Sequence, residues 1–249
     1  MNGSVYIGGV TLKRLPENDD YLRDIPAVRH LIREKHIAFT KPVTFLVGEN
    51  GTGKSTLLEA IAVAYGFNAE GGTKNFNFST RNTHSELASC IFLEKNDYPE
   101  DGFFLRAESF YNLATDIDED NERGGMGRRI IESYGSVSLH KQSHGESFFS
   151  VIKNRFGGRG FYVLDEPEAA LSPMRLMSLL VIINELVKNN SQFIISTHSP
   201  ILMAYPDAQI YELSQIGIAS VDYRDTEHYR ITKQFVEAPD KMIHYLLDD

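Results

Sequence analysis

The sequence predicts an α/β protein in which helices flank a mostly parallel central sheet. Apolar runs at 41–48, 161–164 and 191–197 ("KPVTFLVG", "FYVL" and "SQFIIST") are typical of strands buried on both faces. Apolar residues at helical spacing follow at 54–66 and 173–189. Buried strands that alternate with helices form a parallel sheet covered on both faces, so we expect this fold class.

The rest of the chain predicts smaller elements around this sheet. Short segments rich in β-forming residues indicate an antiparallel β-rich part, a small helical, loop-rich insert follows at about 109–150, and the tail predicts two strands and two helices. The ranges are 75–80, 86–95 and 102–109 for the β-rich segments, 208–214 and 218–225 for the tail strands, and 226–237 and 239–247 for the tail helices. Because we find no repeat, linker or sustained heptad pattern, we expect a single domain over residues 1–249.

The charge balance argues against nucleic acid as a general partner. The 249 residues carry a formal net charge of −9, which repels a phosphate backbone unless a local basic patch is present. The stretches "RNTHSE" at 81–86 and "RGGMGRR" at 123–129 could form such a patch, although solvated loops are the more common origin of such stretches. The acidic run "DIDEDNERGG" at 116–125 predicts a solvated loop.

The sequence predicts a cytoplasmic protein without a membrane span. Its start, "MNGSVYIGGV", lacks the basic and apolar regions of a secretory signal. The apolar run at 177–187 is broken by Asn184 and Glu185 and is shorter than the ~20 residues that a spanning helix needs. The single cysteine, Cys90, lies in an apolar stretch that predicts a strand, where we expect a buried, reduced thiol.

The stretch "GENGTGKST" predicts a site for the phosphates of a nucleotide. It matches the pattern G-x-x-x-x-G-K-[ST] and stands between a strand and a helix, as that pattern requires. Glycines let backbone N–H groups turn toward phosphate oxygens, and the helix N-terminus adds positive potential. Lys54 is expected to reach the β- and γ-phosphates and Ser55 to ligate Mg²⁺, while Thr56 suits packing within the first helical turn. The nucleotide-binding residues of this loop are predicted to be Gly48, Glu49, Asn50, Gly51, Thr52, Gly53, Lys54, Ser55 and Thr56.

Two acidic residues follow the strand at 161–164. Asp165 and Glu166 are expected at its carboxyl end, beside the phosphate loop. There Asp165 can hold Mg²⁺ through its water shell, and Glu166 can accept a proton from the water that attacks the γ-phosphate. An acidic N-cap of the next helix is the alternative interpretation.

A third strand ends in Thr197, His198 and Ser199. Ligands of a parallel sheet bind outside the carboxyl ends of its strands, so these residues are expected at the same edge as Asp165. We expect His198 to sense the γ-phosphate, the alternative being an ordinary polar strand end.

The order of these motifs resembles that of the ABC-type ATPases. Within them, "DEPEAALSP" and "THSP" look most like the compact bacterial AAA-family ATPases related to the heads of RecF, OLD and SMC proteins, and less like transporter subunits. The resemblance spans roughly residues 40–205. It implies a P-loop NTPase fold of the ABC-ATPase type, ATP and Mg²⁺ as cofactors, and an ATP-dependent homodimer that closes head to tail.

In that family a helix with a Ser-Gly-Gly-Gln-like signature precedes the Asp-Glu strand, and "QSHGES" occupies this place. The resemblance assigns Ser143 to the signature Ser, Gly145 to its second Gly and Glu146 to its Gln or Glu. These three residues would contact the γ-phosphate bound by the other copy. Gln142 and His144 depart from the usual Leu and Gly.

Further family positions are not matched one to one. Residues 169–172 fall where the D-loop of the family crosses between subunits. No Gln precedes Gln142, so the Gln with which family members touch Mg²⁺ is missing, and Glu108, Ser109 or Asn112 could replace it.

An adenine-stacking residue and a zinc site are weaker candidates. Tyr21 could stack on adenine, although an exposed loop tyrosine needs no ligand. His140 and His144 could share a helix face as metal ligands, but no third ligand of suitable spacing accompanies them, so zinc is not expected.

The leading functional hypothesis is an ATP hydrolase whose two copies close around ATP and Mg²⁺. One alternative is an ATP-gated module that binds DNA or a protein in repair or phage defence, and another is the nucleotide-binding subunit of an ABC transporter. The motifs do not name the process that ATP drives.

Overall fold

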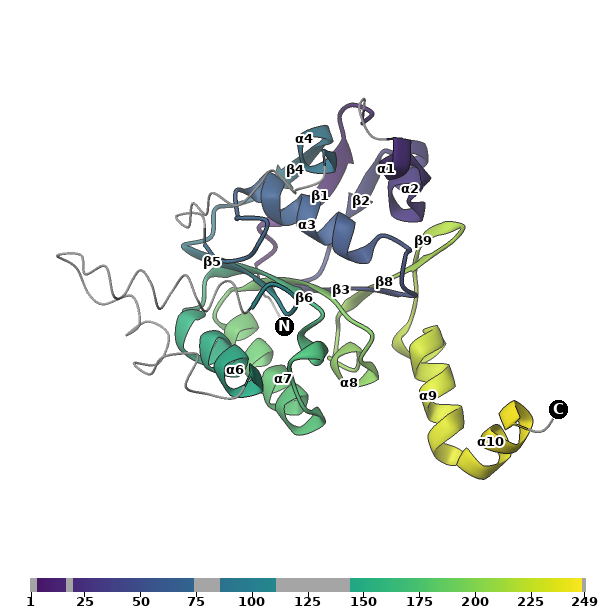
Figure 1. The fold of residues 1–249 in the computed structure, drawn as a ribbon. Coiled ribbons are helices and arrows are strands. Elements are labelled where there is room, and N and C mark those ends of the chain that lie inside the picture. The colour runs from purple at the N-terminus through teal and green to yellow at the C-terminus, as the bar shows by residue number, and fades with distance from the viewer. Residues whose placement is uncertain (1–3, 17–19, 74–85, 111–143, 248–249) are drawn as a thin grey trace.

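The computed structural model describes residues 4–16, 20–73, 86–110 and 144–247, which form two sheets and the helices packed on them (Figure 1). The strands are β1 (Ile7–Leu12), β2 (His36–Ala38), β3 (Val43–Gly48), β4 (Ile91–Lys95), β5 (Asp101–Arg106), β6 (Gly160–Asp165), β7 (Gln192–Ser196), β8 (Gln209–Ser214) and β9 (Gly217–Ser220). The α-helices are α1 (Asp20–Asp24), α2 (Pro26–Glu34), α3 (Lys54–Tyr65), α4 (Leu87–Cys90), α6 (His144–Arg155), α7 (Pro173–Lys188), α8 (Pro200–Met203), α9 (Glu227–Glu237) and α10 (Pro239–Leu247).

The larger sheet has the order β5-β6-β7-β3-β8-β9 and confirms the predicted parallel core. Its first five strands in this order run parallel, and only β9 is antiparallel to its neighbour β8. The side chains of β6 show why the sequences of these strands are apolar at successive positions. Tyr162 and Leu164 face one core layer, and Phe161 and Val163 face the other. All four are fully buried, since helices cover both faces of the sheet.

The two core layers contain different elements. Figure 1 shows α6, α7 and α8 on one face of the large sheet and α3 on the other, between the large sheet and a smaller sheet of order β2-β1-β4. This smaller sheet is antiparallel. Helix α9 leaves the body next to α8 and continues into α10, which projects away from both sheets (Figure 1).

Local sequence accounts for the ends of the main helices. Helix α3 ends at Gly66, whose left-handed backbone (φ 110°) lets its N–H bond to the carbonyls of Ala62 and Val63. Helix α7 begins with Pro173 after an extended Ser172. Both predicted helices are thereby confirmed, as are the predicted tail helices α9 and α10.

Several local predictions were wrong. Cys90 is buried as expected, but it ends a short helix rather than lying in a strand, because Leu87 and Cys90 are spaced to bury one face of a helical turn. The segment at 102–109 contributes to β5 of the large parallel sheet, so the antiparallel part does not include it. The second tail strand stops at Ser220, because the chain turns through Tyr223–Asp225 into α9.

Two further predictions concern Tyr21 and the segments between residues 74 and 143. Tyr21 is exposed, but it lies in α1 rather than in a loop. The predicted strand at 75–80 and most of the insert predicted at 109–150 lie outside the described residues.

The Gln192 side chain joins the two sheets. Its Oε1 accepts a hydrogen bond from the Ile7 N–H at 2.8 Å, and its Nε2 donates to the Ile7 carbonyl at 2.9 Å. Both residues are fully buried. One amide therefore satisfies two backbone groups of β1 that would otherwise lack a partner.

Replacing Gln192 with Leu is expected to lower the free energy of unfolding by about 2 to 5 kcal/mol, because two buried backbone groups lose their partners. The matched control is Gln215→Leu, whose side chain is exposed in the β8–β9 turn and should change stability by less than about 0.5 kcal/mol. Urea unfolding of both variants measures the difference. Equal stabilities would mean that the sheets are held together without this amide.

Candidate functional site

The phosphate loop predicted at 48–56 connects β3 to α3, and its glycines have the backbone that other residues rarely adopt. Gly48, Gly51 and Gly53 have φ values of 131°, 80° and 95°. A Cβ on Gly48 would lie 2.0 Å from the Leu213 carbonyl oxygen, and one on Gly53 would lie 2.4 Å from the Ile25 side chain. All three glycines are therefore required by backbone conformation, and Gly48 and Gly53 also by the close approach of neighbouring segments.

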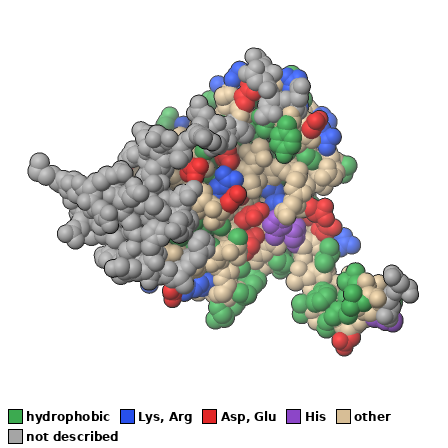
Figure 2. All heavy atoms as spheres, viewed as in Figure 1, with side chains coloured by type: hydrophobic (Ala, Val, Ile, Leu, Met, Phe, Trp, Pro, Cys, Tyr) green, Lys and Arg blue, Asp and Glu red, His purple; other side chains and the backbone are tan. Residues whose placement is uncertain are grey.

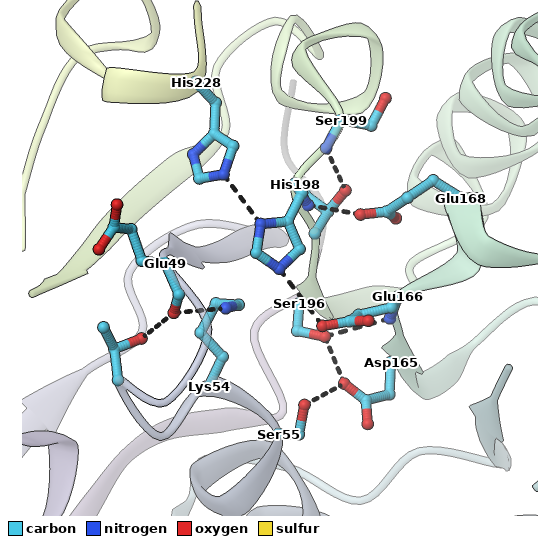
Figure 3. A network of polar contacts seen from close by, with 12 residues as sticks. Glu49, Lys54, Ser55, Asp165, Glu166, Glu168, Ser196, His198, Ser199 and His228 are labelled. Carbon is cyan, nitrogen blue, oxygen red and sulfur yellow. Dashed lines mark hydrogen bonds and ion pairs between the residues drawn. The ribbon is translucent and has the colours of Figure 1, made fainter. Parts of the chain in front are cut away.

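Two side chains of the loop turn back onto its backbone. Lys54 Nζ and Thr52 Oγ1 both donate to the Glu49 carbonyl, at 2.9 and 2.7 Å (Figure 3). Lys54 is buried, and its burial lowers the pKa of the ammonium although nearby carboxylates, first Glu166 and then Asp165, act in the opposite direction. The loop thus places one desolvated positive charge among acidic side chains.

Asp165 lies at the carboxyl end of β6, against the start of α3. One carboxylate oxygen accepts from Ser196 Oγ at 2.5 Å and from Ser55 Oγ at 3.1 Å (Figure 3). The other oxygen lies 3.3 Å from Arg106 Nε, an ion-pair contact without hydrogen-bond geometry. Burial raises the pKa of the Asp165 carboxyl, although Ser196 and Arg106 favour the charged form.

Arg106 connects this cluster to Glu108, one of the three candidate replacements for the missing Gln. Its Nη1 contacts Glu59 at 2.7 Å, and its Nη2 lies 3.5 Å from Glu108. Of the three candidate replacements, Glu108 is thus linked to Asp165 through Arg106. Ser109 instead donates to the Glu70 carbonyl at 2.5 Å, and Asn112 lies outside the described residues.

Glu166 follows Asp165 in a left-handed conformation, with φ 48° and ψ 54°. Its N–H donates to the carbonyl and to the hydroxyl of Ser196, both at 3.1 Å. Its carboxylate lies 3.4 Å from His198 Nε2 (Figure 3). The turn of the backbone therefore directs the Glu166 side chain toward His198, which follows β7, the next strand of the sheet.

His198 lies at the edge where the sequence predicts it. Its backbone N–H donates to the Glu168 carboxylate, and Ser199 N–H donates to Thr197 Oγ1 at 3.0 Å. Its Nδ1 lies 2.8 Å from His228 Nε2, on α9. Burial, followed by the Lys54 ammonium, lowers the pKa of the His198 imidazole. Figure 2 shows histidine side chains beside acidic and basic ones on the surface of this region.

The described part of the signature lies at the start of α6, on the opposite face of the sheet from α3 (Figure 1). The Gly145 carbonyl accepts from Arg175 Nη1 at 2.6 Å, and Glu146 lies 3.6 Å from Arg175 Nη2. A Cβ on Gly145 would lie 2.7 Å from the Ala170 carbonyl, so the signature and the 169–172 segment touch. Ser143 lies outside the described residues.

Four residues of the site were missed by sequence reasoning: Arg106, Glu168, Ser196 and His228. Arg106 and Ser196 end strands that run parallel to β6, so the rule used for His198 could have found them. Glu168 belongs to the motif "DEPEAA", but only the first two acids of this motif directly follow the apolar strand residues that predict the site. No local pattern indicates His228, because its contact with His198 spans 30 residues.

The oxygen atoms beside the phosphate loop suit a hard divalent cation. Mg²⁺ is typically held by one or two side-chain oxygens together with waters and phosphates, and Ser55 and Asp165 offer such a pair. In the part of the chain that the structure describes, no group of three or more His, Cys, Asp or Glu residues could hold a metal ion. His140 lies outside that part, so the pair it would form with His144 is not tested.

The fold and this site define a P-loop ATPase of the ABC/AAA type. A model of the AAA domain family matches residues 27–153, which is 127 of the 249 residues, and the chain belongs to that family. A second AAA-domain model, whose description also names an AbiEii toxin of a type IV toxin–antitoxin system, matches residues 147–204. The two matches together include the phosphate loop, Asp165 and His198.

The chain is also similar, at low sequence identity, to ATP-binding proteins of transport systems. The tungstate uptake system ATP-binding protein TupC of Campylobacter jejuni is 23% identical over 82% of this chain and 67% of its own length. The ribose import ATP-binding protein RbsA of Bacillus cereus is 26% identical over 64% of this chain, but the match spans only 35% of that protein. The structure of cbiO1 from Clostridium perfringens, part of the ABC transporter complex cbiONQ, covers 98% of this chain and 99% of its own, at 16% identity and a TM-score of 0.51. This structural likeness concerns the fold alone.

None of the helices in the described residues is both long enough and apolar enough to cross a membrane.

Two alanine substitutions in the phosphate loop should distinguish the cost of a steric clash from the cost of a positive φ. Gly48→Ala is expected to lower the free energy of unfolding by about 3 kcal/mol or more, because the new Cβ meets a backbone carbonyl as well as a positive φ. Gly51→Ala has no atom within 4 Å of its Cβ and should cost only about 1 to 2 kcal/mol for its φ of 80°. Denaturant unfolding without nucleotide measures both. Equal losses would contradict the close approach of Leu213.

Proposed function

We propose that this ATPase hydrolyses ATP with Mg²⁺ while two copies close head to tail, and that the residues around Asp165 perform the chemistry. The observation that carries the proposal is the contact between Ser55 and Asp165 at 3.1 Å, beside the Lys54 ammonium. This contact brings the start of α3 and the end of β6 together beside the phosphate loop. A cation bound to the phosphates there would find two oxygen ligands, Ser55 Oγ and the Asp165 carboxylate.

The phosphate loop binds the triphosphate. Backbone N–H groups between Gly48 and Thr56 and the N-terminus of α3 supply partial positive charge, and Lys54 supplies a full charge toward the β- and γ-phosphates. Ser55 and Asp165 would hold Mg²⁺. When bound, this ion offsets the negative charge that develops on the phosphate oxygens. Glu49, Asn50 and Thr56 complete the loop.

Glu166 and His198 serve hydrolysis itself. Glu166 accepts the proton of the attacking water, and its left-handed backbone directs the carboxylate toward the site of attack. His198 donates from Nε2 to the γ-phosphate, where one well-placed donor contributes about 3 kcal/mol to transition-state stabilisation. The 3.4 Å separation of the two side chains supports a shared target.

Dimer closure brings the signature of one copy to the phosphate loop of the other. Ser143, Gly145 and Glu146 contact the γ-phosphate from the opposite side, and the first turn of α6 offers the positive end of a helix to it. The contact of Gly145 with the Ala170 carbonyl supports joint movement of the signature and the 169–172 segment.

A transporter subunit is the second candidate function. The observation in its favour is the similarity to TupC and RbsA, whose names describe uptake and import. A membrane partner that copurifies with this protein would support transport, whereas stimulation of ATP turnover by DNA would support an ATP-gated DNA-binding module.

Lys54→Met is expected to weaken ATP binding about 10- to 100-fold while leaving the fold as stable as the wild type. The variant removes a charge-assisted contact worth roughly 1.5 to 3 kcal/mol, and the ammonium that it removes is desolvated in the folded protein. Calorimetry with ATP and Mg²⁺, together with thermal unfolding, measures both effects. Lys41→Met, an exposed lysine two residues before β3, is the matched control. Unchanged affinity in Lys54→Met would refute the phosphate-loop assignment.

Glu166→Gln is expected to accumulate an ATP-bound dimer, because the amide keeps the shape of the carboxylate but cannot take the proton. Light scattering should report a doubled mass only when ATP and Mg²⁺ are present.

Adding Ala169→Arg to Glu166→Gln places a long charged side chain on the exposed segment that the dimer would bury, so the mass should return to that of the monomer while ATP still binds. Tyr98→Arg, at an exposed position in the connection before the amino end of β5, is the control and should leave the dimer intact. A dimer that survives Ala169→Arg would exclude closure through this face.

A further inference from the structure

A second histidine reaches the site from the C-terminal part of the chain. His228 Nε2 lies 2.8 Å from His198 Nδ1, and the two rings meet edge to face with centroids 4.9 Å apart (Figure 3). His228 belongs to the first turn of α9, which lies outside both sheets. The contact therefore joins the predicted phosphate sensor to an element with no other motif.

The first turn of α9 is held in place on both sides of His228. Thr226 caps the helix by accepting from the Tyr229 N–H at 3.4 Å, and its hydroxyl donates to the Tyr223 carbonyl at 2.8 Å. The Glu227 N–H donates to the Glu212 carboxylate at 2.9 Å. Glu212 lies on β8, the strand beside β3 and the phosphate loop. The ring of His228 is thus positioned by the backbone on either side of it.

The surroundings of His198 select the nitrogen that carries its proton. Its Nε2 faces the Glu166 carboxylate at 3.4 Å, and a carboxylate can only accept. A neutral imidazole protonated on Nε2 has a bare Nδ1, which accepts a hydrogen bond. The 2.8 Å contact then requires His228 to donate from Nε2.

The second ring nitrogen of His228, Nδ1, also indicates that His228 is the donor. His228 Nδ1 is buried and lacks a hydrogen-bond partner among the described residues. If His198 donated instead, the proton of a neutral His228 would lie on this Nδ1 as a buried N–H without an acceptor, which costs more than a bare ring nitrogen. Burial, followed by the Lys54 ammonium, lowers the pKa of both imidazoles, which favours the neutral forms.

We propose that His228 is a positioning residue for ATP hydrolysis: it donates to His198 Nδ1 and thereby keeps the His198 proton on Nε2, directed at Glu166 and the γ-phosphate. This rests on the function proposed for His198. Partners of this kind orient a ring and fix its tautomer; for metal-ligating histidines their loss typically lowers activity roughly 10- to 100-fold, and we expect a loss of similar size here.

The kinetic test compares substitutions at position 228. His228→Phe keeps the ring but removes the donor, so kcat should fall roughly 10- to 100-fold with the affinity for ATP unchanged. His228→Gln places an amide N–H near the position of Nε2 and should recover most of this loss, whereas the shorter His228→Asn should not. His244→Phe, an exposed His-to-Phe change on α10, is the matched control and should hydrolyse ATP as the wild type does.

A double variant tests whether His228 acts through His198. In the His198→Ala background, His228→Phe should cause no further loss, since the group that it positions is gone. Wild-type kcat in His228→Phe, or independent losses that multiply in the double variant, would overturn the proposal.

Tautomer populations give a readout besides activity. Two-bond ¹H–¹⁵N spectra of the histidine-labelled full chain should show His198 protonated on Nε2 in the wild type and as a mixture of tautomers in His228→Phe, with His228→Asn as the second variant if the first folds poorly. An unchanged His198 tautomer in a folded variant would refute the positioning role. If His198→Ala itself hydrolysed ATP normally, the function proposed for His198 would fail, while the spectra would still decide the role of His228.

Discussion

The Asp165 carboxylate is the point on which the arrangement of the site depends. It ends the central strand β6 in a buried place, where an uncompensated charge costs several kcal/mol. Its compensating groups come from three other segments: Ser55 from the start of α3, Ser196 from β7 and Arg106 from β5. A shift of β6 by one residue would separate the carboxylate from all three, so this charge links the register of the sheet to the position of the phosphate loop.

The site as a whole combines one buried cation with several carboxylates. Lys54 lies in the field of Glu166, Asp165, Glu168 and Glu49. A triphosphate that enters such a place meets repulsion from the acids, which the loop N–H groups and Lys54 offset only in part. A divalent cation between the carboxylates and the phosphates removes the conflict, since it is attracted to both. These carboxylates thus give a physical reason why the proposed ATP hydrolysis would require Mg²⁺.

The sequence predicted the elements whose signals are local. The phosphate loop, Asp165, Glu166 and His198 all follow strands that bury both faces, and the rule for parallel sheets placed them at one edge. Cys90 was misjudged, because a run of four or five apolar residues fits a helical turn as well as a strand. Arg106 could have been found by the strand-end rule, but β5 was not assigned to the central sheet. His228 could not have been found, because the contact that gives it meaning exists only once α9 is folded beside β8.

Helix α9 connects two very different environments. Its first turn touches His198, while its later residues and α10 carry exposed apolar side chains such as Val236 and Leu247. A hydrogen bond tolerates only a few tenths of an ångström of stretching before it weakens, so a tilt of α9 that is small at its base breaks the contact between the two imidazoles. The projecting end acts as a lever on this contact, so with His198 and His228 in the roles proposed above, a force applied to α10 would change the rate of ATP turnover from far outside the nucleotide site.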